Sequence, residues 1–191
     1  MGKITEDVYK IPGNCNIYLI TNPEPTLIDT GDLVDSVYIK SEIEKIIPVA
    51  EIKNVLLTHL HYDHAGNVEM FPNAKFYAAK EEIENYIYSR CDFFFFNISY
   101  KTDDILRNEL IELPEKICEL DVIKCPGHTR GSVAFLDKKR KLLFSGDTIF
   151  DNGIGRTDFN NSMPEKMQAS VERLVKEVKN NKLTLLPGHD Y

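Results

Sequence analysis

The heptapeptide T-H-L-H-Y-D-H at residues 58–64 contains four side chains of the types that bind metal ions, and it directly follows an apolar stretch. His59 and His61 are two residues apart, so in an extended chain both imidazoles project to one side and can reach one metal ion. Asp63 and His64 stand where the chain is expected to turn into a helix, which aims them in a different direction. The heptapeptide therefore predicts half of one metal site and the beginning of a second.

Three further candidate ligands share a local pattern in which an apolar stretch ends in glycine and the next residue is histidine or aspartate. His128 follows V-I-K-C-P-G, Asp147 follows L-L-F-S-G, and His189 follows L-T-L-L-P-G. Open α/β folds place their sites at strand ends, and a glycine there lets backbone approach closely. We therefore expect these residues to converge with the heptapeptide. Asp29 follows T-L-I, but a carboxylate there can equally orient an imidazole, so it is kept out of the ligand set.

The motifs also have a purely structural explanation. An isolated H-x-H is more often a packing or surface feature than a metal site, and the G-D at 146–147 can simply cap a turn. However, all five histidines of the chain fall within the motifs described above. The joint pattern therefore favours a metal site.

The composition favours one globular domain over residues 1–191, since 42% apolar residues are enough to bury a substantial core. A formal net charge of -7 argues against binding of nucleic acid, which needs clustered Lys and Arg. The N-terminus lacks a basic region followed by an apolar stretch, and no segment approaches the ~18 apolar residues of a membrane span. The four cysteines are scattered, which fits reduced thiols. The sequence therefore predicts a soluble cytoplasmic protein with no membrane partner.

Short apolar stretches alternate with helical patterns along the chain, which favours an α/β architecture. Expected strands cover residues 8–11, 16–20, 26–29, 55–57, 74–78, 122–125, 133–136, 142–144 and 183–186, and expected helices cover 36–47, 80–89 and 163–178. At the last helix, Ser162 and Glu165 fit a capping box and Pro164 fits the first turn. The pattern therefore predicts where this helix begins.

Residues 86–110 show no clean periodicity, because D-F-F-F-F-N at 92–97 places four consecutive aromatic residues between polar ones. This aromatic run is interpreted either as a core or dimer contact or as a cap over the site. The sequence does not indicate an oligomeric state.

Taken together, T-H-L-H-Y-D-H-A-G, P-G-H-T, S-G-D-T and P-G-H-D, in this order, resemble the metallo-β-lactamase superfamily over nearly the whole chain. The resemblance implies a four-layer αβ/βα sandwich with a metal site at one edge between two sheets. It implies two divalent metal ions, with zinc expected first and iron or manganese also suited to nitrogen and oxygen ligands. The implied ligand sets are His59, His61 and His128 for one ion and Asp63, His64 and His189 for the other, with Asp147 as the bridge.

The stretch G-I-G-R-T-D-F at 153–159 is similar to the glyoxalase II-like group of that superfamily. This implies a hydroxyacylglutathione hydrolase-like enzyme acting on a small-molecule acyl thioester or ester. Two metal ions that share an oxygen can lower the pKa of water, so a bridging hydroxide can attack the carbonyl without a protein nucleophile. Asp63 is the expected catalytic residue, orienting that hydroxide. Arg156 and Asp158 can equally form an ion pair within a loop.

Other reactions and substrates stay open. The chain ends at Tyr191, so it is expected to lack the C-terminal helical segment that helps bind glutathione in full-length glyoxalase II. Other acyl thioesters and lactones are therefore also candidate substrates, although the G-R-T-D-F loop disfavours lactones. That loop, together with P-G-H-D-Y, also resembles mononuclear iron persulfide dioxygenases, in which the iron ligands by motif position would be His59, His128 and Asp147. A non-catalytic metal-binding module is disfavoured, because no member of the ligand set is missing.

Overall fold

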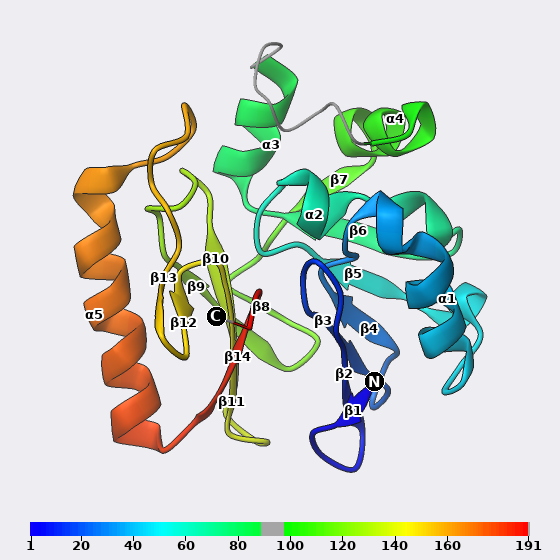
Figure 1. Ribbon diagram of the computed structural model, residues 1–191, viewed down its shortest axis with the longest axis horizontal. Coiled ribbons are helices and arrows are strands. Elements are labelled where there is room, and N and C mark those ends of the chain that lie inside the picture. The colour runs from blue at the N-terminus through cyan, green and yellow to red at the C-terminus, as the bar shows by residue number, and fades with distance from the viewer. Residues whose placement is uncertain (89–97, 191) are drawn as a thin grey trace.

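The structure, a computed structural model, describes residues 1–88 and 98–190. Its centre consists of two β-sheets that face each other (Figure 1). The seven-stranded sheet has the order β1 (Gly2–Lys3), β2 (Val8–Ile11), β3 (Ile17–Ile20), β4 (Thr26–Ile28), β5 (Asn54–Leu56), β6 (Lys75–Ala78) and β7 (Leu110–Glu112). Strands β1 to β4 pair antiparallel, and strands β4 to β7 pair parallel. The parallel part therefore directs its strand ends towards one edge.

The second sheet has five strands, in the order β14 (Thr184–Pro187), β11 (Leu142–Gly146), β10 (Val133–Asp137), β9 (Leu120–Lys124) and β8 (Lys116–Ile117). A separate pair consists of β12 (Ile149–Phe150) and β13 (Gly153–Ile154). Strand β14 pairs parallel with β11, and the other neighbours in the five-stranded sheet pair antiparallel. The parallel pairing brings the residues that follow β11 and β14 to the same edge.

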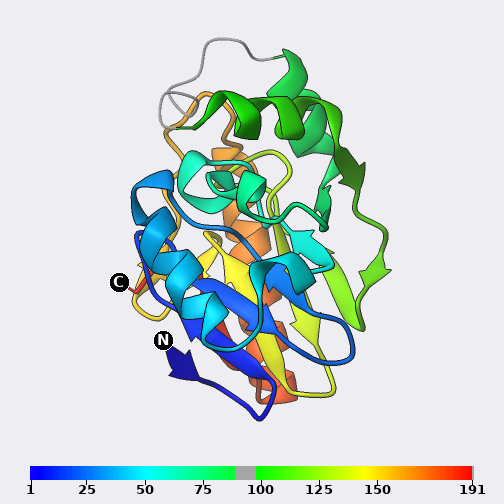
Figure 2. The same ribbon diagram turned by 90° about the vertical axis from the view of Figure 1, so that its right-hand side faces the viewer.

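Helices cover the outer face of each sheet. On the seven-stranded side lie η1 (Leu33–Asp35), α1 (Ser36–Glu44), η2 (Val49–Glu51), α2 (Tyr62–Ala65), η3 (Val68–Met70), α3 (Lys80–Tyr88) and α4 (Tyr100–Asn108). Helix α5 (Pro164–Asn181) lies on the five-stranded sheet (Figure 1). In Figure 2, α3 and α4 lie beside each other at one end of the molecule. The layers follow the αβ/βα order, which confirms the predicted fold class.

The core follows from the two-residue period of the strands. In β3, Tyr18 and Ile20 face the other sheet, whereas Ile17 and Leu19 pack with the helices. All four residues are buried, as expected for a strand covered on both faces. Tyr18 meets Phe144 of the second sheet edge to face, with ring centroids 5.2 Å apart, an arrangement that contributes about 0.5–1.5 kcal/mol beyond area burial. Truncation of such a core side chain is expected to destabilise the fold by several kcal/mol.

Two expectations from sequence need correction or limitation. The capping box at the last helix does not form, because Met163 is the N-cap residue and the Ser162 hydroxyl donates to the His128 carbonyl oxygen at 2.6 Å. Residues 86–110, in which the sequence shows no clean periodicity, contain the end of α3, all of α4 and the start of β7. The aromatic run Phe93–Phe96 lies outside the described residues. Across the described ranges, every helix is too short or too polar to cross a membrane.

Candidate metal centre

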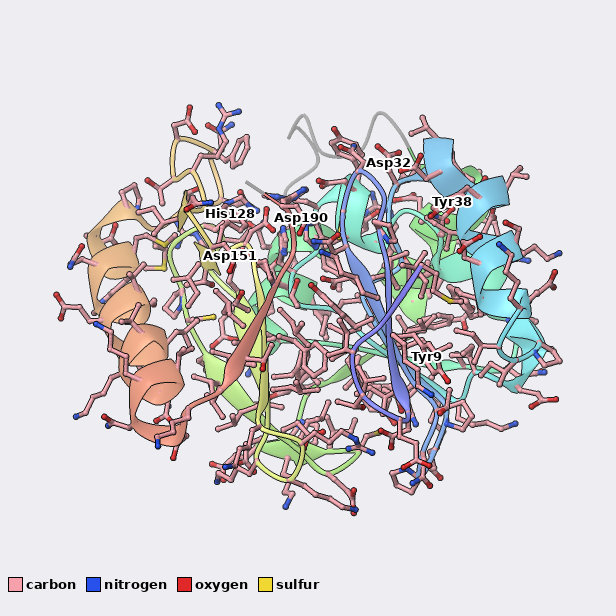
Figure 3. All side chains as sticks on the ribbon, turned by 60° about the horizontal axis from the view of Figure 1, so that its bottom comes forward. Tyr9, Asp32, Tyr38, His128, Asp151 and Asp190 are labelled. Atoms are coloured by element: carbon pink, nitrogen blue, oxygen red, sulfur yellow. The ribbon has the colours of Figure 1, made fainter. Side chains whose placement is uncertain are left out.

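All seven residues singled out from the sequence lie at one edge of the sandwich, between the two sheets. Four loops carry them: the loop that follows β5 into α2, and the segments that follow β9, β11 and β14. Figure 3 shows His128 and Asp190, the neighbour of His189, at the same end of the molecule. The structure therefore brings together side chains that are more than one hundred positions apart in sequence, such as His64 and His189 (125 residues apart).

The first group consists of His59, His61 and His128, all buried. One ring nitrogen of each lies within 4.8 Å of the others, and His128 Nε2 is 3.0 Å from His61 Nδ1. The opposite nitrogens are held from behind, since His59 Nδ1 lies 3.0 Å from the Thr58 hydroxyl and His128 Nδ1 lies 2.7 Å from the Arg156 carbonyl oxygen. Among the described residues, none gives buried His59 Nε2 a hydrogen-bond partner. A buried nitrogen of this kind fits an inward-facing metal ligand.

The second group consists of Asp63, His64 and His189, whose ligand atoms also lie within 4.8 Å of one another. His64 Nε2 is 3.4 Å from His189 Nε2, and His189 Nε2 is 3.5 Å from Asp63 Oδ2. His64 is fully buried, whereas the Asp63 side chain is 16% exposed. The second group therefore combines two nitrogens with one carboxylate that reaches the surface of the site.

Asp147 lies between the two groups. Its Oδ1 is 3.3 Å from His64 Nε2, while its Oδ2 is 3.5 Å from His128 Nε2 and 3.3 Å from His189 Nε2. Gly155 explains how the backbone accommodates this residue, because a Cβ at that glycine would lie 1.8 Å from the Asp147 carbonyl oxygen. Asp147 therefore contacts imidazole nitrogens of both groups.

Asp29 stands behind the second group. Its carboxylate accepts hydrogen bonds from the Thr58 backbone N–H at 2.8 Å and the Thr58 hydroxyl at 2.9 Å, and its Oδ2 lies 2.9 Å from His64 Nδ1. The Cys15 thiol is also close to that ring, with Sγ 3.3 Å from His64 Nδ1. Asp29, Cys15 and His64 could also surround an ion by distance alone. Because the Asp29 carboxylate is already engaged with Thr58 and His64, orientation of the imidazole is the better interpretation.

The charges of the two groups differ. Burial is the main cause that lowers the pKa of His59 and His61 well below the ordinary value, and it also lowers the pKa of His128. These rings are neutral at pH 7 and can bind a cation. For His64, burial acts to lower the pKa, but Cys15 and the carboxylates of Asp147, Asp29 and Asp63 raise it well above the ordinary value. Burial acts to raise the pKa of Asp147, but the nearby histidines keep it well below the ordinary range.

An open cleft of about 570 Å³ leads to both groups. Its wall carries apolar and aromatic side chains beside the candidate ligands, including Tyr62, Phe150, Ile154 and Phe159. Arg156 lies at the rim, where it forms a two-bond ion pair with Asp158 at 2.6 and 2.7 Å and stacks on the Phe159 ring at 4.4 Å. The loop ion pair considered from the sequence therefore forms, and both of its side chains are exposed.

The chain belongs to the metallo-beta-lactamase superfamily, since the family model matches residues 11–189. Its relatives include hydroxyacylglutathione hydrolases. That of Synechococcus sp. is 29% identical over 163 residues, covering 83% of this chain and 57% of the relative. GloC of Haemophilus influenzae is 26% identical over 195 residues, covering 92% of this chain and 84% of the relative.

Another relative is the probable polyketide biosynthesis zinc-dependent hydrolase PksB of Bacillus subtilis, 34% identical over 146 residues, which cover 74% of this chain and 58% of PksB. The chain therefore spans less than two thirds of the Synechococcus and Bacillus proteins. Among solved structures, TTHA1623 in a di-iron-bound form aligns with a TM-score of 0.72 and 27% identity, covering 96% of this chain and 93% of that one. These similarities support a metal-dependent hydrolase.

Proposed function

We propose that this chain is a glyoxalase II-like hydrolase of an acyl thioester or ester, in which the two groups of candidate ligands and Asp147 would hold two divalent ions. The supporting observation is the position of that carboxylate, which contacts His64 and His189 of the second group and His128 of the first at 3.3–3.5 Å. Bound divalent ions would supply the Lewis acidity that activates water near neutral pH and stabilises developing negative charge on the substrate oxygen. Zinc is the expected metal, and iron or manganese would suit the same ligand types.

The imidazoles and the carboxylates have different proposed roles. His59, His61 and His128 would hold one ion through uncharged nitrogens, and Asp63, His64 and His189 would hold the other. Binding at the second group would release the proton that His64 carries in the metal-free protein. Asp63 is the proposed catalytic residue, because its side chain is part of the cleft wall and is 16% exposed. Its carboxylate can therefore reach a water molecule in the cleft, orient that water and accept its proton.

The cleft suits a small acyl substrate. Tyr62, Phe150 and Phe159 offer apolar surface next to the candidate ligands, and Arg156 adds a positive charge at the rim. The names of the hydroxyacylglutathione hydrolase relatives support an acyl thioester as the substrate class. A thioester needs little help from a general acid, because a thiolate is a good leaving group.

We also propose a domain organisation and a cellular compartment for the protein. Residues 1–191 form one domain, and the enzyme works in a reducing compartment, the cytoplasm being the expected one. Cys15, Cys118 and Cys125 support this, since each of these described cysteines is a free thiol.

The decisive experiment applies three measurements to one preparation isolated without added metal: metal content, cleavage of an S-acyl glutathione thioester, and oxygen uptake with glutathione persulfide. We expect two ions per chain and thioester cleavage that falls sharply in His64→Ala and His189→Ala. Rapid oxygen uptake with one iron per chain and negligible cleavage would replace the hydrolase by the persulfide dioxygenase. Absence of both activities in a metal-loaded protein would point to a non-catalytic metal-binding module.

A further inference from the structure

Glu82, in the first turn of α3, is a buried carboxylate that is not among the candidate ligands. Its side chain spans two loops, because Oε2 accepts the Leu60 backbone N–H at 3.0 Å and Oε1 accepts the Gly131 backbone N–H at 2.9 Å. The Thr129 side chain also hydrogen-bonds to it. The residue is 2% exposed, so its carboxylate depends on these donors for the interactions that water would otherwise supply.

The two loops are those that carry the first group. Leu60 stands between His59 and His61, and Thr129 directly follows His128. One carboxylate therefore connects the H-x-H segment, on the seven-stranded side, to the segment after β9, on the five-stranded side. A backbone hydrogen bond from Val133 N–H to the Thr58 carbonyl, at 3.0 Å, connects the same two segments farther from the ligands.

Gly131 shows independently how closely Glu82 is packed against the second loop. A Cβ at position 131 would lie 2.6 Å from the Glu82 backbone nitrogen and 2.7 Å from its Cγ. Contacts below 3.0 Å do not occur for real Cβ atoms, so only glycine lets this loop approach the carboxylate. Glycine at position 131 and glutamate at position 82 together allow this close contact between the loop and α3.

The second group is held by other contacts. His64 is held by Asp29. The segment before His189 is fixed by β3 and the residue before it, since the Tyr18 hydroxyl donates to the Pro187 carbonyl at 2.8 Å and Asn16 N–H donates to the Gly188 carbonyl at 2.7 Å. The described contacts of Glu82 reach neither of those elements. Glu82 thus contacts only the loops of the first group, whereas Asp29 contacts His64 of the second group and also Thr58, which precedes His59.

We propose that Glu82 is a positioning residue for the first group: its carboxylate fixes the distance between the H-x-H loop and His128, and thereby sets the affinity of one of the two metal positions. This inference rests on the proposed metal centre. Metal–nitrogen bonds of about 2.0–2.1 Å tolerate errors of only about 0.2 Å, so a small separation of the loops weakens all three bonds together. Loss of a partner outside the ligand set commonly lowers metal affinity by about 10–100-fold.

The test replaces Glu82 by Gln, which keeps the shape but turns one acceptor oxygen into an NH2 donor facing a backbone N–H. Glu81→Gln is the matched control, because Glu81 lies in the same turn and pairs on the surface with Lys124 at 2.7 Å. Zn²⁺ affinities are measured by chelator competition in the full chain. We expect Glu82→Gln to weaken one of the two positions by about 10–100-fold and Glu81→Gln to weaken neither.

Two background variants identify the position affected. In His189→Ala, where the remaining ion is held by the first group, adding Glu82→Gln is expected to lower its affinity by the same factor. In His61→Ala, where the remaining ion is held by the second group, adding Glu82→Gln is expected to change nothing. An equal loss in both backgrounds would mean that Glu82 only supports the fold, and the inference would be wrong.

Thr129→Val keeps the inference testable if Glu82→Gln does not fold, since it removes one of the hydrogen bonds to the carboxylate. Ser132→Ala is its control, because the Thr129 hydroxyl also bonds to the Ser132 hydroxyl at 2.8 Å. A smaller loss confined to the first position would support the inference, and unchanged affinities in a folded variant would overturn it. A wild-type chain that binds fewer than two ions would refute the proposed function, and this inference with it. Two tight ions in both the wild type and Glu82→Gln would refute the inference alone.

Discussion

The two groups of candidate ligands differ in charge and in the way they are held. The first has three imidazoles and no carboxylate of its own, and two of its rings, His59 and His128, are fixed by the Thr58 hydroxyl and the Arg156 carbonyl. The second includes Asp63, and its central His64 rests on the Asp29 carboxylate. A cation in the second position would therefore meet more negative charge from the protein than a cation in the first.

The largest effects are expected when one ligand is removed from each group in turn. His59→Ala is expected to empty the first position and His189→Ala the second, each with loss of one ion per chain. The rate of thioester cleavage should fall by more than about 100-fold in both variants, because the proposed reaction needs both metal positions. This is a larger loss than the one expected when a residue that only supports a ligand is replaced. Metal analysis and steady-state kinetics on the same samples check this. Full metal content and turnover in both variants would contradict the ligand assignment.

A change of smaller effect separates how the groups are supported. Asp29→Asn keeps the side-chain shape but removes the charge behind His64, so affinity at the second position is expected to fall by about 10–100-fold. The first position is expected to weaken less, because Asp29 reaches it only through Thr58. Asn is the suitable replacement because Asp29 has φ 60°, a left-handed conformation that asparagine tolerates. Chelator competition measures both affinities. Equal weakening of the two positions would show that Asp29 stabilises the whole edge of the sandwich and not one group.

The difference between the groups also marks how far the sequence could predict the site. Strand ends followed by glycine were enough to predict that His128, Asp147 and His189 converge, because parallel strands end at a common edge. The residues that hold the candidate ligands in place could not be predicted in this way. Cys15 and His64 are 49 positions apart in the sequence, and so are Glu82 and Gly131. No sequence periodicity connects the members of either pair.

The errors in the sequence interpretation have a related cause. Ser162 satisfies a local capping motif, but its hydroxyl instead satisfies the His128 carbonyl, a partner 34 positions away. Helix α4 and strand β7 went unrecognised because the aromatic run next to them removes the periodicity on which such predictions depend. A tertiary contact therefore decided the first case, and a gap in the local pattern decided the second.

The metal-free protein should reveal the charge difference through the pH dependence of its stability. The pKa values of His59, His61 and His128 are lowered, so their contribution is present above the ordinary pKa near 6.5 and is lost as the pH falls below it. The pKa of His64 is raised, so its contribution is present below pH 6.5 and is lost as the pH rises above it. Each group contributes a slope of about 1.4 kcal/mol per pH unit.

The free energy of unfolding without metal is therefore expected to pass through a maximum near pH 6.5. Urea denaturation with a chelator at several pH values between about 5.5 and 7.5 measures it. His64→Asn should remove the decline on the alkaline side and leave the decline on the acid side. A stability that rises steadily with pH in the wild type would show that His64 is neutral, and the contrast between the groups would not hold.

The smallest expected effect concerns Arg156, which supports the first group with its backbone and faces the cleft with its side chain. The carbonyl oxygen lies 2.7 Å from His128 Nδ1 and is retained in Arg156→Ala, so metal content and melting temperature should stay unchanged. The exposed ion pair with Asp158 adds little to stability in any case. What the variant does lose is a positive charge at the rim of the cleft, so KM for an anionic thioester should rise a few-fold at low salt while kcat is retained. Asp158→Asn is the matched control, because it frees the guanidinium and should lower KM. If Arg156→Ala instead released metal, the side chain would be holding His128 through its stacking on Phe159, and the first group would depend on a surface residue after all.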